Sequence, residues 1–145
     1  KEPLFFEQGN RIVHFHLDGL SCSMAICYDI RFPEWIRRQV LAGETDLFFV
    51  PAAWPEKRLF HWTLLNQARA VENQMYLCAV NQGGVSGQTQ YAGNSALIDP
   101  WGEDVCRLGT EEEIAVGEID TEVIRKIRNT IHIFKDRRPE FDVVK

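Results

Sequence analysis

The chain has 145 residues, with 45% hydrophobic residues, 26% charged residues and a formal net charge of −5 at pH 7. This length suits a single domain with its own core, and the composition is ordinary for a globular protein. The mixed, mildly acidic charge argues against nucleic acid or an anionic membrane as a partner, and no apolar run is long enough to span a bilayer.

The first segment of the chain predicts a β-hairpin. Residues 12–17, IVHFHL, alternate between apolar and polar side chains and predict a strand. The dipeptide DG at 18–19 is a strong signal for a tight hairpin turn. Residues 21–27, SCSMAIC, predict the returning strand, which is apolar at its far end.

The next segments predict two helices around a buried strand. The stretch FPEWIRRQVLAG at 32–43 predicts a helix, since Pro33 suits its first turn and Gly43 suits its end. Residues 46–51, DLFFVP, form a continuous apolar run, which is typical of a strand covered on both faces. Residues 59–73 have apolar side chains at helical spacing and predict the second helix.

The second half of the chain continues the alternation of strands and helices. Three more strands and one helix are predicted, in chain order, over 75–80, 94–100, 114–120 and 121–129. Thr121 is expected to cap that helix. The stretch NQGGVSGQTQYAG at 81–93 predicts a long flexible loop of the kind that borders binding sites. Apolar strands alternating with helices predict an α/β layered fold.

Cys27 is the first candidate for chemistry, because it lies where a predicted strand gives way to a helix. Such a turn can present a side chain at the end of a sheet, with backbone amides directed at it. The amides would stabilise a thiolate and later an oxyanion, and the N–H of Tyr28 is the natural donor. The alternative is that Cys27 fills the core, since free cysteine is among the most buried residue types. Position alone leaves both interpretations open.

The four cysteines are expected to be free thiols in a reducing cytoplasm. They are Cys22, Cys27, Cys78 and Cys106. None forms a CxxC pair, and the three besides Cys27 lie in apolar, strand-like surroundings.

The histidines and the serines do not predict a site. His14 and His16 share one face of a strand, but no third ligand at metal-binding spacing accompanies them, so we predict no metal site. His61 lies among aromatic residues in a helix and is expected to be packed or hydrogen-bonded. No GxSxG motif surrounds Ser95, which argues against a serine hydrolase.

Several residues around the predicted strand ends have two open interpretations. Arg31 either braces the turn after Cys27, together with Asp29, or binds a substrate carboxylate. Trp54 and Tyr91, both in loops, either form the wall of a substrate pocket or pack in the ordinary way.

One ion pair is predicted within the second helix. Arg69 and Glu72 are three residues apart and can pair on one helix face. We expect them to form a buried ion pair that holds the helix to the sheet.

Three stretches together resemble the nitrilase superfamily of carbon–nitrogen hydrolases, and most closely its ω-amidase-like branch. They are ICYDIRFPEW, PAAWPEKRLFHWTLLNQARAVENQ and YAGNSALIDPWGE. The resemblance implies an αββα sandwich, of which residues 1–145 form only the C-terminal part. It also implies a catalytic set of glutamate, lysine and cysteine, and Cys27 matches the cysteine.

The resemblance places a second, supporting glutamate at Glu2, where it would orient the catalytic lysine or help to position the substrate. The principal glutamate and the lysine of the family have no match in this sequence. KEPLFFEQGN begins abruptly at Lys1, so we expect the chain to be a piece of a longer protein.

The implied reaction is hydrolysis of a small aliphatic amide through a cysteine thioester, with no metal or organic cofactor. The implied assembly is a homodimer or a higher homo-oligomer. Two alternatives remain open at this point: an inactive fragment or interaction module of the same fold, and a nitrilase or N-carbamoyl amidase.

Overall fold

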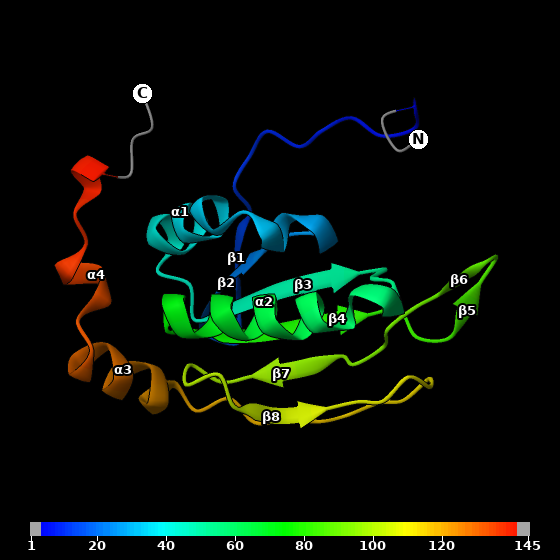
Figure 1. Cartoon of the computed structure of the whole chain (residues 1–145). Coiled ribbons are helices and arrows are strands. Elements are labelled where there is room, and N and C mark those ends of the chain that lie inside the picture. The colour runs from blue at the N-terminus through cyan, green and yellow to red at the C-terminus, as the bar shows by residue number, and fades with distance from the viewer. Residues whose placement is uncertain (1–3, 142–145) are drawn as a thin grey trace.

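The computed structural model describes residues 4–141 of the chain. They form a mixed sheet of six strands in the order β1-β2-β3-β4-β7-β8 (Figure 1). The strands are β1 (His14–Leu17), β2 (Leu20–Met24), β3 (Leu47–Ala52), β4 (Tyr76–Asn81), β7 (Ala96–Ile98) and β8 (Asp104–Arg107). The neighbours β2, β3 and β4 are parallel, and the remaining pairs are antiparallel.

The parallel strands are joined by the two predicted helices, α1 (Pro33–Gly43) and α2 (Leu59–Asn73). Parallel neighbours need such crossover connections, which explains the alternation seen in the sequence. Two further helices follow the sheet, α3 (Thr121–Thr130) and the short α4 (Ile133–Asp136). No helix in the described part of the chain is both long and apolar enough to cross a membrane.

The hairpin between β1 and β2 forms as the sequence predicts. Asp18 and Gly19 have φ values of 47° and 82°. These left-handed values at both central residues are what a tight two-residue turn of this type requires. The register then places His14 opposite Ser23.

The main core lies between the sheet and the helices α1 and α2. Its fully buried members from the two helices and the central strands are Ile36, Val40, Phe48, Val50, Trp62 and Leu77. Alternate residues of β3 explain this, because Phe48 and Val50 face the helices while Leu47 and Phe49 face the other side.

The other face of the sheet is covered less completely. Its smaller core joins Cys22, Leu47 and Tyr76 to Ile124 of α3. Within residues 4–141 the structure therefore provides one large sheet, with α1 and α2 on one of its faces.

The strand predicted over 114–120 is wrong, and β8 was missed. In Figure 1 the segment after β8 runs back beside it in an extended conformation, but within the described chain it pairs with no strand. Ile114 and Val116 are 95% and 91% exposed, so the apolar alternation that suggested a strand is present without a partner.

Helix α1 ends at Gly43 as predicted, but the capping residues of two helices differ from the simplest expectation. The left-handed residue after α1 is Glu44, at φ 49°. Gly43 is instead required for space, because a Cβ atom there would lie 2.2 Å from Nδ1 of His14. Helix α3 is capped by Asp120 rather than Thr121, since Asp120 Oδ1 accepts the N–H of Glu122 at 2.8 Å.

The loop predicted over 81–93 contains a small hairpin. Its strands are β5 (Val85–Ser86) and β6 (Thr89–Gln90), which pair only with each other. Gly87 lies between them with a φ of 60°, which a tight turn demands.

Candidate active site

The strand predicted to run to Cys27 ends at Met24, and Cys27 begins a 3₁₀ turn, Cys27–Arg31. Cys27 has a φ of 47°, in the left-handed region that non-glycine residues seldom adopt. Such a conformation costs about 1–3 kcal/mol and persists only when the surrounding structure holds it. A strained turn between a strand and a helix is known to expose a nucleophilic side chain at the end of a sheet, and the backbone at Cys27 has this geometry.

Asp29 closes the start of this turn. The N–H of Ile26 donates to Oδ2 of Asp29 at 2.9 Å, and the N–H of Asp29 donates to the carbonyl of Ile26 at 3.0 Å. The prediction that Asp29 braces the turn is therefore confirmed.

The backbone N–H of Tyr28 is available at the same turn. It donates to no acceptor found among residues 4–141, as expected for an amide at the start of a helical turn. The side chain of Tyr28 is 62% exposed, and its ring meets that of Phe32 edge to face at 5.6 Å. The Tyr28 ring therefore packs on Phe32, and only the backbone N–H of Tyr28 is assigned the predicted role of oxyanion donor.

The thiol of Cys27 is neither sealed in the core nor fully exposed. Cys27 is half-buried and packs against the edge of the main core. All four cysteines are free. Burial raises the pKa of the Cys22 thiol, and burial followed by the neighbouring Cys106 raises that of Cys78, so these two favour the neutral, unreactive form.

The candidate site lies at the carboxyl ends of the parallel strands. Cys27 follows β2, Trp54 follows β3, and Asn81 is the last residue of β4. Ligands of open α/β sheets bind at this end of the strands. The topology therefore brings the loops that carry Cys27 and Trp54 to one edge of the sheet.

Arg31 lies over the ring of Trp54. Its guanidinium carbon is 4.6 Å from the Trp54 centroid and 5.6 Å from the Tyr28 centroid. An Nη2–Nδ1 distance of 3.4 Å joins Arg31 to His61, which is exposed and hydrogen-bonded rather than packed. Trp54 is only 2% exposed, so its ring supports Arg31 instead of forming an open wall.

Asn81 ties the neighbouring loops together, a role that the sequence did not suggest. Its Oδ1 accepts the N–H of Trp54 at 2.6 Å, and its Nδ2 donates to the carbonyl of Gly93 at 2.8 Å. Tyr91 forms a β-bridge with Pro55, so it lies beside the Trp54 loop. The one sequence feature that could have indicated this role is that a polar asparagine ends an otherwise apolar strand.

The ion pair predicted between Arg69 and Glu72 is present, with an Nη1–Oε1 distance of 2.9 Å. It holds α2 to the turn after Cys27 rather than to a strand, because Nε of Arg69 donates to the carbonyl of Ile30 at 2.9 Å. Arg69 is buried, at 6% exposure.

The remaining candidates lie away from this turn or outside the described residues. Glu2 is outside them, so its predicted role stays a prediction. Nδ1 of His14 lies 2.8 Å from Oγ of Ser23, which gives that imidazole a partner in the hairpin. Among residues 4–141, no group of three or more His, Cys, Asp or Glu side chains could hold a metal ion.

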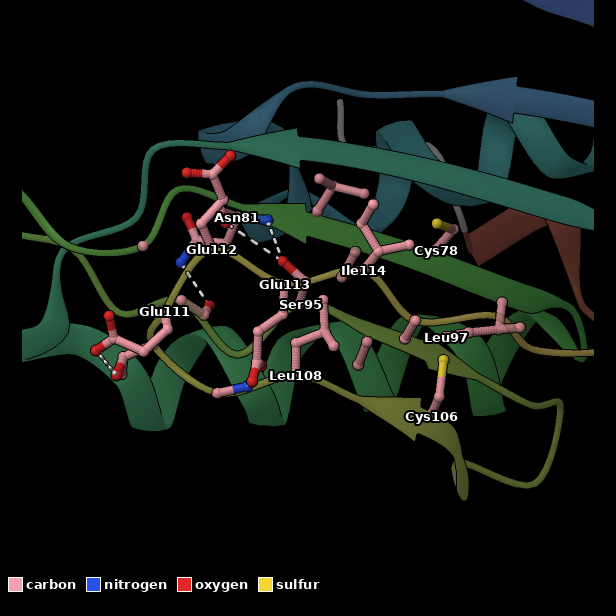
Figure 2. A pocket seen from close by; sticks show the side chains of 18 of the residues that line it. Cys78, Asn81, Ser95, Leu97, Cys106, Leu108, Glu111, Glu112, Glu113 and Ile114 are labelled. Carbon is pink, nitrogen blue, oxygen red and sulfur yellow. Dashed lines mark hydrogen bonds between the residues drawn. The ribbon is translucent and has the colours of Figure 1, made fainter.

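A hollow on the less covered face of the sheet does not include Cys27 (Figure 2). Its volume is about 860 Å³, and its floor includes Cys78, Leu97 and Cys106, which share one face by register. Figure 2 shows Glu111, Glu112 and Glu113 at its other side. Asn81, the last residue of β4, also lines this hollow, whereas Cys27 and Trp54 do not.

The model of the carbon–nitrogen hydrolase family matches residues 1–129. The chain belongs to this family. The family resemblance read from the sequence is thereby confirmed, and the mixed α/β architecture is that of carbon–nitrogen hydrolases.

Curated relatives of this carbon–nitrogen hydrolase chain include amidases. It is 42% identical over 139 residues to the 2-oxoglutaramate amidase of Bacillus subtilis, covering 96% of this chain and 53% of the relative. It is 32% identical over 137 residues to an omega-amidase of Escherichia coli, covering 93% of this chain and 52% of that protein. The chain spans about half the length of these relatives.

Solved structures agree with the fold. A CN-hydrolase superfamily protein from Xanthomonas campestris, with an arsenic adduct in its active site, matches with a TM-score of 0.88 and 31% identity. The match covers 94% of this chain and 54% of that one. A mutant amidase from Nesterenkonia, carrying a covalent adduct on its active-site cysteine, matches with a TM-score of 0.80 and 28% identity, over 94% and 48% of the chains.

Proposed function

We propose that this chain carries the nucleophile of an amidase that hydrolyses small aliphatic amides, and that Cys27 is that nucleophile. The observation that supports this most directly is the left-handed conformation of Cys27. This half-buried residue precedes Tyr28, whose N–H donates to no acceptor found within residues 4–141. The amidases among the relatives support the reaction class.

The reaction begins when the Cys27 thiolate attacks the amide carbonyl and forms a carbon–sulfur bond. The carbonyl oxygen becomes an oxyanion, which accepts a hydrogen bond from the N–H of Tyr28. One preorganised donor of this kind lowers the barrier by about 3–4 kcal/mol. The carbon–nitrogen bond then breaks, ammonia leaves with the proton taken from the thiol, and a thioester remains.

Water completes the cycle by attacking the thioester, which releases the carboxylate and restores the thiol. Both steps need a general base. We assign this base and a lysine at the oxyanion to the part of the protein outside residues 1–145, with Glu2 in a supporting position. No cofactor takes part in these steps.

Arg31 is the proposed contact for an acidic substrate. Among residues 4–141 no carboxylate lies within ion-pair distance of its guanidinium, which rests on Trp54 beside the Cys27 turn. A monoamide of a dicarboxylic acid would supply the missing anion. Tyr91 would border the same substrate, since its loop is paired with that of Trp54.

The test is a substrate panel on a protein that contains the complete fold. Small amides, nitriles and N-carbamoyl compounds are compared for the wild type and for Cys27→Ala, Cys27→Ser and, as a control, Cys106→Ser. We expect amide turnover that both Cys27 variants lose and the control keeps. If the protein hydrolyses nitriles or N-carbamoyl compounds but no amides, the assignment as an amidase is wrong. If Cys27→Ala keeps its activity, the assignment of Cys27 as the nucleophile is wrong.

The proposed setting is a cytoplasmic homodimer or higher homo-oligomer. The outer face of α2 supports self-association, because Phe60, Leu64 and Val71 are all exposed along one side of it. Trp101, 53% exposed, follows the strand β7 and adds to the exposed apolar surface. Sedimentation of the purified protein tests the assembly, and a strictly monomeric protein would refute it.

A further inference from the structure

The turn that presents Cys27 is fixed at two points by side chains, one from the turn itself and one from helix α2. Asp29 closes its start through reciprocal hydrogen bonds with Ile26. Its other end is held by Arg69, whose Nε donates to the carbonyl of Ile30 at 2.9 Å. These two residues, Ile26 and Ile30, bracket the cysteine.

Arg69 is itself held rigidly in helix α2. Its side chain is 7% exposed, and its Nη1 donates to Oε1 of Glu72 at 2.9 Å. The same carboxylate oxygen lies 3.5 Å from Nδ2 of Asn73, which donates in turn to the carbonyl of Arg69 at 2.9 Å. A short network thus connects the last turn of α2 to the turn after β2.

The left-handed conformation of Cys27 needs support from surrounding residues, and this network can provide it. A strained residue stays in place only where its surroundings leave no lower-energy alternative. The residue itself lies in a single 3₁₀ turn, which has poor hydrogen-bond geometry and little stability of its own. A buried guanidinium that grips the Ile30 carbonyl restricts the backbone three residues beyond the thiol.

We propose that Arg69 is a positioning residue that holds the Cys27 turn in its reactive geometry, acting through the carbonyl of Ile30. This role rests on the proposed function, because it presumes that Cys27 is the nucleophile. Arg69 need not touch the substrate, since its donors already serve Ile30 and Glu72.

The shape of arginine suits this role better than that of lysine. The guanidinium offers two donors in a fixed plane, and here Nε and Nη1 bind two different acceptors. A lysine ammonium is a point charge on a flexible stem, so it can reach one acceptor but fixes their relative positions poorly.

The experiment measures how fast each thiol of the chain reacts with iodoacetamide, resolved by peptide mass spectrometry. The variants are Arg69→Met, Arg69→Lys and Glu72→Gln. Asn66→Ala is the matched control, because Asn66 is also buried in α2 and its side chain donates within the helix, to the carbonyl of Trp62. Urea unfolding of every variant measures stability separately.

We expect Arg69→Met to slow the alkylation of Cys27 by about tenfold, which corresponds to about 1.4 kcal/mol in the barrier. Arg69→Lys should recover part of the rate, and Glu72→Gln should give a smaller loss in the same direction. Asn66→Ala should leave the rate at Cys27 unchanged even where it lowers stability.

A purely structural role would give the opposite sign, because loosening of the fold exposes thiols. Faster alkylation of the buried Cys22 and of Cys78 together with Cys27 would therefore overturn the proposal. So would a normal Cys27 rate in folded Arg69→Met, in which case Cys27 remains the nucleophile and the proposed function stands. If Arg69→Met does not fold, an unchanged Cys27 rate in Glu72→Gln overturns the positioning role.

The wild-type protein separates this proposal from the proposed function. Cys27 should react faster than Cys106, a half-buried thiol within strand β8. Equal rates would overturn the nucleophile assignment and the positioning role with it.

Discussion

The guanidinium of Arg31 lies 4.6 Å from the centre of the Trp54 ring, and Trp54 is almost completely buried beneath it. This contact joins the turn after β2 to the loop after β3. A cation over an indole face gains about 0.5–1 kcal/mol at an exposed site and more when water is excluded. Arg31 is thus held in place beside the Cys27 turn.

The first prediction concerns substrate selection by Arg31. Arg31→Lys keeps the charge but loses the planar fork that binds a carboxylate through two bonds. We expect KM for a dicarboxylic monoamide to rise by about tenfold, equivalent to about 1.4 kcal/mol of lost binding. Steady-state kinetics on a protein with the complete fold measures this.

A neutral aliphatic amide of similar length serves as the control for Arg31→Lys, and its KM should change little. If both substrates lose kcat equally and the urea midpoint falls, Arg31 braces the turn and does not bind the substrate.

The second prediction concerns the brace at Asp29. Asp29→Ala removes the acceptor for the Ile26 N–H and should lower the free energy of unfolding by about 1 kcal/mol. Asp29→Asn keeps an acceptor oxygen and should lose less. Urea unfolding followed by circular dichroism measures both, and equal losses would mean that the carboxamide cannot replace this hydrogen bond.

The sequence predicted the sheet and its helices well where burial alone decides the pattern. The helix predicted over 59–73 has the observed boundaries, and the strand predicted over 46–51 is shifted by one residue in β3. Both elements are dense in apolar side chains that face the main core. Helix periodicity and a continuous apolar run report such burial directly.

The sequence failed where long-range partners decide the structure. Residues 114–120 alternate like a strand, but a strand exists only if another strand pairs with it. The glycine at position 43 likewise reflects a distant residue, because the His14 ring occupies the space that a side chain there would need.

The candidate site was predicted in part. Cys27 could be found because its position after an apolar strand and its family pattern agree. The hydrogen bond from Arg69 to the Ile30 carbonyl could not be predicted, because it joins residues 39 apart in sequence and depends on how α2 packs on the turn. Periodicity predicted that Arg69 pairs with Glu72, but it carries no information about a backbone carbonyl elsewhere.

The third prediction concerns the loop beside Asn81. Gly93 has a φ of 54°, and a Cβ atom there would lie 2.4 Å from the carbonyl oxygen of Gly109. Gly93→Ala should therefore destabilise the protein by more than the roughly 1 kcal/mol expected for left-handed strain alone. The comparison measures the urea midpoint of each variant.

Gly87→Ala is the matched control for Gly93→Ala. Gly87 has a similar φ of 60°, but nothing lies within 4 Å of a Cβ atom at that position. The stability loss of Gly87→Ala should therefore reflect the left-handed backbone strain alone. Equal losses in the two variants would mean that the Gly109 backbone moves aside at little cost.

The fourth prediction concerns stability at high pH. Burial raises the pKa of Cys22 and Cys78 above the ordinary 9.0, and burial likewise raises that of Tyr76 above 10.0. Below pH 9 these groups are neutral in both the folded and the unfolded state, so they should add no pH dependence. As pH rises through the ordinary values, the unfolded chain loses its protons first, and the free energy of unfolding should fall.

Urea unfolding between pH 7 and 10 measures this fall. Replacing both of these thiols, in Cys22→Ala/Cys78→Ala, should lower the overall stability but flatten the slope that begins near pH 9, because two groups that ionise on unfolding are gone. A slope that is identical in the wild type and the double variant would show that these thiols ionise equally in both states, against the burial that the structure gives them.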